Sequence, residues 1–165
     1  MNKLIILNGV INSGKSTIGR ELQNKCKNLA FVEIDDLRNF IPWMPIEDAV
    51  PLNIKNGIDV SRNFIKNNID VIIAYPLSDN DFNYMKDLID FDCEIIGVTL
   101  YCELSENLKN RGTRELSHYE KERLEWMHRN GLAKPLFSKI YNNTRKTIEE
   151  TCNELIIDLK LTKNV

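Results

Sequence analysis

The residues best suited to chemistry lie near the start of the chain, where residues 9–16 read GVINSGKS after an apolar stretch. This run fits the pattern GxxxxGK[ST], whose glycines let backbone amides turn inward around phosphate oxygens. In such a loop Lys15 reaches the β- and γ-phosphates of a nucleotide, Ser16 binds Mg²⁺, and the following helix adds a favourable dipole. The predicted nucleotide contacts are Gly9, Asn12, Ser13, Gly14, Lys15, Ser16 and Thr17. We therefore predict a site for ATP and Mg²⁺.

A second group of charged side chains follows the second predicted strand, where residues 35–38 read DDLR. A carboxylate close to a γ-phosphate can accept the proton of an attacking hydroxyl or orient water on Mg²⁺, and a neighbouring arginine can hold an anionic acceptor. The alternative is that Asp35 or Asp36 only caps the next helix and that Arg38 is a solvated charge. We favour the catalytic interpretation, with Asp35 ahead of Asp36 as the base, and with Asp36 and Arg38 as acceptor contacts.

Two further features could complete a lid and an acceptor site. A polar connector carries Arg111 and Arg114, with Gly112 between them. Either guanidinium could swing over bound phosphates when the connector closes, so both are candidate catalytic residues, and a solvated basic turn is the alternative. Tyr75 follows the third predicted strand and is a candidate acceptor contact that could stack on a ring. Packing in the core is the equally supported alternative for Tyr75.

The elements that must position these residues alternate between strand and helix patterns. Apolar runs predict strands at 3–8, 31–34, 70–74, 93–101 and 154–159. Helical spacing and start signals predict helices after residue 15, over 54–65, after 78, over 103–110, after 117 and over 137–151. Prolines make the segment 40–51 a loop or an irregular helix. The alternation predicts right-handed βαβ units in a three-layer α/β/α fold with a parallel five-stranded sheet.

Composition limits the class of protein. The chain has 165 residues, which suits a single domain over 1–165, and its 42% hydrophobic and 28% charged residues are ordinary for a globular protein. A net charge of −2 gives no global positive field to attract nucleic acid or an anionic membrane. We find no leader pattern and no apolar stretch of membrane-spanning length, so we expect a cytoplasmic protein. The scattered cysteines at 26, 93, 102 and 152 are expected to be reduced thiols.

Motifs beyond the glycine loop narrow the class further. The chain has no NKxD guanine-reading motif and no apolar-apolar-Asp at the end of the third predicted strand, which disfavours GTPases and large ATPase machines. Residues 9–16, 35–38 and 111–114 together resemble the nucleoside- and metabolite-kinase group of P-loop proteins. The spacing is closest to polynucleotide 5′-hydroxyl kinases, which have Asp-Asp-x-Arg after a strand and Arg-Gly-Thr in the lid. The chain is also similar to chloramphenicol phosphotransferase and to adenylylsulfate and gluconate kinases, which place an Asp at the position of Asp35.

This resemblance implies a P-loop NTPase fold with a short lid and a role for each matched residue. Asp35 would be the general base, and Arg38 would contact the acceptor. Arg111 or Arg114 would be the lid arginine that stabilises charge on the moving phosphoryl group. The Asp-x-Asp pattern and glycine run of shikimate kinases are missing, as is the Asp-Gly-x-Pro-Arg of adenylate kinases. The resemblance therefore leaves the acceptor open.

We expect an ATP-dependent kinase that transfers the γ-phosphate to a hydroxyl of a small-molecule acceptor, which would be a metabolite, a nucleoside or an antibiotic. The nearest alternative is a polynucleotide 5′-hydroxyl kinase, although an acidic isoelectric point disfavours a nucleic-acid partner. An alternative from another class is a regulatory or toxin-like protein that binds ATP without catalysis. No membrane partner is expected.

Overall fold

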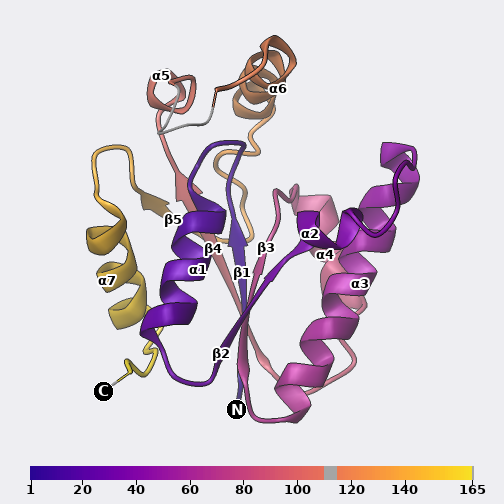
Figure 1. Ribbon diagram of the computed structural model, residues 1–165, viewed down its shortest axis with the longest axis vertical. Coiled ribbons are helices and arrows are strands. Elements are labelled where there is room, and N and C mark those ends of the chain that lie inside the picture. Colours follow the sequence, from indigo (N-terminus) through magenta and orange to yellow (C-terminus); the bar gives the residue numbers. More distant parts are fainter. Residues whose placement is uncertain (110–114, 165) are drawn as a thin grey trace.

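The fold is organised around one parallel sheet. The computed structural model describes residues 1–109 and 115–164. These residues form a five-stranded parallel sheet in the order β2-β3-β1-β4-β5 (Figure 1), as the alternation of elements predicted. The strands are β1 (Lys3–Asn8), β2 (Leu29–Glu33), β3 (Asp70–Ala74), β4 (Glu94–Tyr101) and β5 (Lys139–Asn142). β1 lies at the centre of the sheet and pairs with β3 on one side and with β4 on the other.

Helices cover both faces of the sheet and complete the three predicted layers. They are α1 (Lys15–Lys25), α2 (Ile34–Arg38), α3 (Ile46–Lys66), α4 (Asp79–Asp87), α5 (Leu104–Asn107), α6 (His118–Arg129) and α7 (Ile148–Asp158). Figure 1 shows α1 and α7 on one face, α3 and α4 on the other, and α5 and α6 beyond the end of the sheet to which the strand arrows point. Across residues 1–109 and 115–164, none of these helices combines the length and apolar character that a membrane crossing requires.

The side chains of β1 alternate between two apolar cores, because successive residues of a strand point to opposite faces. Ile5 and Leu7 are buried in the core that also contains residues of α1 and α7. Leu4 and Ile6 are buried in the core formed with α3 and α4. A central strand that is covered on both faces needs the continuous apolar run of the sequence, and this packing holds the loop after β1 at a fixed place.

The topological switch point of the sheet is at β1, because the strands before and after the crossover lie on opposite sides of it. The chain leaves β1 through α1 to reach β2 on one side of the sheet, and β4 lies on the other side. Parallel α/β proteins bind ligands beyond the carboxyl ends of the strands at such a point. The glycine loop follows β1 directly, α2 follows β2, and Tyr75 follows β3. The predicted site residues of three neighbouring strands therefore meet at one edge of the sheet.

The predicted fifth strand at 154–159 is wrong, because this segment belongs to helix α7. Leu155 and Ile156 are buried while the next residue, Ile157, is 73% exposed. This burial follows the face of a helix rather than the strict alternation of a strand. The start of the helix was visible in the sequence as Thr147-x-x-Glu150, and these two residues form a complete capping box.

The predicted helix at 137–151 is also wrong, because it covers strand β5 and the turn before α7. β5 lies at the edge of the sheet, and Lys139 and Asn142 at its two ends are exposed. An edge strand this short carries no apolar run, so its sequence resembles that of a polar helix. The sheet thus has the predicted number of strands, with the last one in a different place.

Other element boundaries shift by smaller amounts. β2 ends at Glu33, so residues 35–38 lie on α2 rather than directly on the end of a strand. The proline-containing segment is half helical, since α3 begins at Ile46 with Pro51 inside it. In the described residues the helix expected over 103–110 is the single turn α5. The helix starts after Ser78 and Ser117 are confirmed, each by a capping box.

Candidate active site

The loop between β1 and α1 has the conformation that its glycines and Asn12 allow. Gly14 has a φ of +93° and Asn12 a φ of +60°, both in the left-handed region. A Cβ atom on Gly9 would lie 2.8 Å from the Leu100 carbonyl oxygen, so this position needs a residue without a side chain. The loop is therefore a backbone cradle that leads into the N-terminus of α1, the arrangement that binds phosphate groups.

Lys15 and Ser16 occupy the first turn of α1. The Lys15 ammonium donates hydrogen bonds to the carbonyl oxygens of Gly9 and Val10, at 2.8 and 3.0 Å, and so lies over the loop. The Ser16 hydroxyl donates to the carboxylate of Glu33. Both residues line a cleft above the glycine loop, and they are the predicted contacts of the phosphates and of Mg²⁺.

Glu33 is a site residue that the sequence analysis missed. It is the last residue of β2, and its side chain is largely buried beside Ser16 and Arg20, whose Nη2 donates to it at 3.2 Å. A hydroxyl and a carboxylate side by side supply the hard oxygen ligands that Mg²⁺ prefers. β3, by contrast, ends at Ala74 and is followed by Tyr75, so no carboxylate stands at this point. The donor set at Ser16 and Glu33 therefore fits a magnesium ion, and the signal for it was a charged residue at the end of a strand.

The structure distinguishes Asp35 from Asp36. Asp35 lines the cleft together with Lys15, whereas Asp36 accepts a hydrogen bond from Arg20 at 3.3 Å on the exposed side of α2. Partial removal of water raises the pKa of the Asp35 carboxyl above its usual range. The Lys15 charge opposes this rise and the Glu33 charge adds to it. Of these two neighbouring carboxylates, Asp35 is thus the one that lines the cleft.

Arg38 and Tyr75 lie close to Asp35 without a direct contact to it. Tyr75 is buried after β3, and burial, followed by the charge of Asp35, raises the pKa of its phenol to about 12. The phenol is therefore protonated at neutral pH and can donate a hydrogen bond. The positive charge of Arg38 partly opposes the rise in both pKa values, because it favours the ionised carboxylate and the ionised phenol. Tyr75 also packs in the core with α3 and α4, so both of its predicted roles remain.

The cleft above the glycine loop has a volume of about 590 Å³, which is enough for a nucleotide. One wall consists of the glycine loop, Glu33 and Asp35. The opposite wall was not predicted, since it comes from the β5–α7 connection and from α7; its residues are Asn143, Lys146, Ile148 and Thr151. The sequence analysis missed this wall because it predicted a helix over 137–151, where the structure has β5 and a connection that lies beside the glycine loop.

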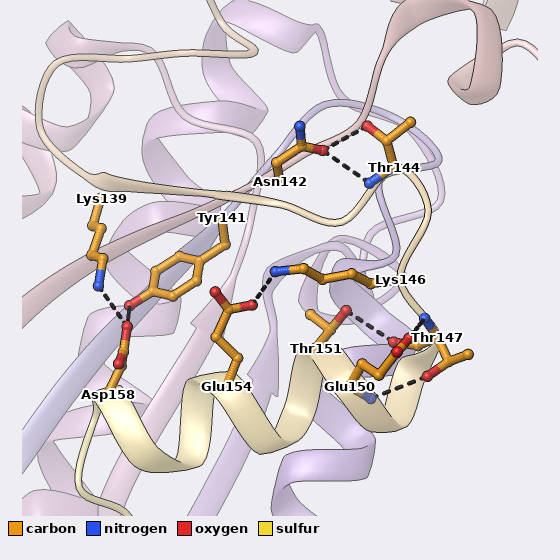
Figure 2. A network of polar contacts seen from close by, with 10 residues as sticks. All are labelled: Lys139, Tyr141, Asn142, Thr144, Lys146, Thr147, Glu150, Thr151, Glu154 and Asp158. Atoms are coloured by element: carbon orange, nitrogen blue, oxygen red, sulfur yellow. Dashed lines mark hydrogen bonds and ion pairs between the residues drawn. The ribbon is translucent and has the colours of Figure 1, made fainter.

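The β5–α7 connection is held by its own polar contacts (Figure 2). The Asn142 amide oxygen accepts from the backbone and hydroxyl of Thr144, and Lys146 reaches along α7 to pair with Glu154. Asn143 joins the connection to the glycine loop by donating to the Ser13 carbonyl oxygen at 2.9 Å. Within the described residues, the Asn143 amide oxygen and the Ser13 hydroxyl are buried without a partner. Both residues line the cleft, but these two atoms are enclosed by the protein, and the Ser13 hydroxyl lies against Gly9.

A partly buried network centred on Asn107 connects the glycine loop to α5 and α6. The Asn107 side chain donates to the Asn12 carbonyl oxygen at 3.2 Å, and the Asn12 side chain donates back to the Asn107 carbonyl oxygen at 2.8 Å. The Asn107 amide oxygen then accepts from His128 Nε2 at 3.0 Å. Burial, followed by the charge of Lys134, lowers the pKa of His128, so the ring is neutral at pH 7 with its proton on Nε2. The predicted lid residues Arg111 and Arg114 lie outside the described residues.

Replacing Asn107 should loosen the glycine loop from α5 and α6. We expect Asn107→Ala to lower the free energy of unfolding by about 1–3 kcal/mol, because it leaves the half-buried Asn12 carbonyl oxygen and His128 Nε2 unpaired. We also expect a higher KM for ATP. Asn130→Ala is the matched control, since Asn130 is exposed and its amide donates to the Trp126 carbonyl oxygen one turn earlier on the same helix, and its effect should stay within about 0.5 kcal/mol. Equal denaturation curves for the two variants would contradict the role of this network.

Comparison with known proteins places this site in a recognised fold. No family model matches the chain, and no curated protein matches it by sequence. Among solved structures, a sugar kinase from Janibacter sp. is 14% identical with a TM-score of 0.70, covering 98% of this chain and 96% of that one. The tunicamycin resistance protein of Deinococcus radiodurans is 16% identical with a TM-score of 0.67, covering 100% and 99%. An APS kinase of Mycobacterium tuberculosis is 15% identical with a TM-score of 0.65, covering 96% and 98%. The glycine loop, the parallel sheet and these likenesses together show that the chain has the fold of the P-loop kinases.

Proposed function

We propose that the protein is an ATP-dependent kinase that transfers the γ-phosphate to a hydroxyl group of a small-molecule acceptor. The observation that carries this proposal is that Lys15 and Asp35 line one cleft. A phosphate cradle alone supports nucleotide binding. A carboxylate with a raised pKa beside the cradle adds a group that can take a proton from an alcohol.

The reaction follows from the placement of these groups. The acceptor oxygen attacks the γ-phosphorus while the bond from that phosphorus to the β–γ bridging oxygen breaks, and the hydroxyl proton passes to Asp35. Lys15 and the loop amides hold the phosphates and stabilise the negative charge that develops on them. Ser16 and Glu33 would hold Mg²⁺, which supplies further charge neutralisation on the phosphates. Residues 143–148 and Thr151 would hold the nucleoside part of ATP along the opposite wall.

The assignment of Glu33 to Mg²⁺ can be tested apart from turnover. We expect Glu33→Gln to weaken Mn²⁺ binding to the protein–nucleotide complex about 10- to 100-fold, measured by electron paramagnetic resonance with Mn²⁺ in place of Mg²⁺. Nucleotide affinity without a divalent ion should change little. Glu21→Gln is the matched control, since Glu21 pairs with Lys25 on α1 and does not line the cleft. Equal Mn²⁺ affinity for Glu33→Gln and Glu21→Gln would remove Glu33 from the metal site.

The kinase proposal itself is tested by ADP release with candidate acceptors. The panel contains nucleosides, sugars, aminoglycosides, chloramphenicol-like alcohols and 5′-hydroxyl oligonucleotides, each with ATP and Mg²⁺. A small-molecule kinase predicts release above background with one of the small alcohols. Stimulation by the oligonucleotide alone, with affinity that falls steeply as salt rises, would instead indicate a polynucleotide kinase. ATP binding without stimulation by any acceptor would support the non-catalytic alternative.

A further inference from the structure

A second, smaller cavity lies between α2 and the start of α3, with a volume of about 70 Å³. Its lining residues are Arg38, Ile41, Pro42, Trp43, Met44, Ala49, Leu52 and Asn53. Arg38 connects this cavity to the proposed base, because residues three apart on a helix lie on the same face and Arg38 is three residues after Asp35. The electrostatic effect of Arg38 on the pKa values of Asp35 and Tyr75 agrees with this closeness. The cavity is therefore next to the place where an acceptor hydroxyl must lie.

Asn53 is the unusual residue of this cavity. It lies on α3 and is only 4% exposed, yet the structure gives its amide no hydrogen bond within the described part of the chain. The Asn53 amide is not among the fully enclosed polar atoms without a partner, so it is open to the cavity that Asn53 lines, where water or a ligand can satisfy it. The amide offers one acceptor and two donor hydrogens to whatever occupies the cavity.

The rest of the cavity wall is apolar and continues into exposed aromatic rings. Phe40 is 84% exposed and Trp43 is 78% exposed on the connection between α2 and α3. Ile41 on the same connection and Ile46 at the start of α3 are also exposed. Large side chains gathered in solvent in this way are typical of binding surfaces. Indole and phenyl rings bind other planar rings through stacking, which needs no hydrogen bonds from the ring faces.

We propose that this cavity recognises the acceptor, and that the acceptor is an alcohol carrying a planar heterocycle with donor and acceptor groups on its edge, as in a nucleoside. The inference rests on the proposed kinase function. Asn53 reads the edge of the ring, Trp43 covers one of its faces, and the hydroxyl extends past Arg38 to Asp35. A cavity of this size takes the edge of a ring rather than the whole of it, which agrees with the exposure of Trp43.

The chemistry of the wall disfavours a polyol. A sugar or an inositol carries hydroxyl groups around its whole ring, and each needs a hydrogen-bond partner when it is buried. Within the described residues, Arg38 and Asn53 are the polar side chains of this cavity, and the other lining side chains are apolar. Most hydroxyls of a polyol would therefore be left unpaired, whereas the faces of a heterocycle would be well covered.

Nucleoside binding can be measured by tryptophan fluorescence, without turnover, because the chain has two tryptophans, Trp43 and Trp126. Trp126 lies on α6 against Arg123, so Trp126→Phe leaves Trp43 as the only tryptophan reporter. We expect adenosine, guanosine, cytidine or uridine to quench Trp43 fluorescence in a saturable way, and glucose and myo-inositol not to do so. Trp43→Phe, which retains Trp126, is the control for quenching elsewhere and should show no saturable signal.

Asn53→Leu separates recognition from folding. Leucine has a similar volume and no unpaired amide, so we expect equal or higher thermal stability, unchanged ATP affinity and a Kd for the nucleoside at least about tenfold higher. Asn63→Leu, an exposed asparagine on the same helix, should leave the Kd unchanged. Saturable quenching that Asn53→Leu does not weaken would overturn the inference. Phosphorylation of a polyol with an unchanged KM in Asn53→Leu would overturn it too, while leaving the kinase proposal intact. Nucleoside binding without ADP release would instead refute the kinase proposal.

Discussion

Asp35→Asn is expected to lower kcat about 10²- to 10⁴-fold while leaving the affinity for ATP and Mg²⁺ close to that of the unchanged protein. The reason is that the proposed role of Asp35 is to accept the proton of the acceptor hydroxyl, whereas the proposed phosphate contacts are the glycine loop and Lys15. An asparagine keeps the shape of the side chain and cannot take a proton. The measurement is single-turnover phosphoryl transfer together with calorimetric titration of a non-hydrolysable ATP analogue.

Asp36→Asn is the matched control for this experiment, because Asp36 is the next residue on the same helix and bonds to Arg20 instead of lining the cleft. We expect its kcat to stay within a small factor of the original value. A large loss in Asp36→Asn together with a small loss in Asp35→Asn would reverse our assignment of the base. Equal and small losses would point away from a carboxylate base altogether.

The raised pKa of Asp35 predicts how both kcat/KM and stability depend on pH. The proposed base must be ionised to accept a proton. Its raised pKa therefore moves the acid limb of the kcat/KM profile to a higher pH than an ordinary aspartate gives, and Asp35→Asn removes that limb.

The effect of Asp35 on the pH dependence of stability has the opposite sign to that of an ion-paired carboxylate, whose pKa is lowered by folding. Between the unfolded and folded pKa values the folded protein binds more protons, so this group lowers stability as pH rises through that window. Asp35→Asn should therefore not lower the melting temperature at neutral pH.

The sequence sufficed where the physical signal was local and strong. The continuous apolar run of β1 and the glycine pattern after it predicted the central strand and the phosphate cradle, because burial on both faces and backbone conformation each restrict residue type. The capping boxes at Ser78 and Ser117 are equally local. Asp35 was singled out by its position after a strand, and the structure places it in the cleft.

The site features that we did not predict from the sequence depend on contacts between distant segments. Glu33 carries only a weak sequence signal, a charged residue at the end of a strand, and its place in the site depends on the N-terminus of α1 bringing Ser16 to it. The wall at 143–148 was hidden because β5 is a short edge strand, stabilised by pairing with β4 rather than by its own composition. Asn53 has no sequence signal at all, since an asparagine in a helix is commonly exposed.

Lys15→Ala should lower kcat about 10²- to 10³-fold and also weaken nucleotide binding, which distinguishes it from Asp35→Asn. In the structure the ammonium is held by the Gly9 and Val10 carbonyl oxygens, so a bound phosphate gains a charge that is already positioned over the loop. Its loss removes both ground-state attraction and stabilisation of the developing charge. Lys25→Ala on the same helix, which removes only a surface pair with Glu21, is the matched control. ATP should lose more affinity than AMP in Lys15→Ala, because AMP lacks the β- and γ-phosphates. An equal loss for ATP and AMP would mean that Lys15 supports the fold of the loop rather than the phosphates that react.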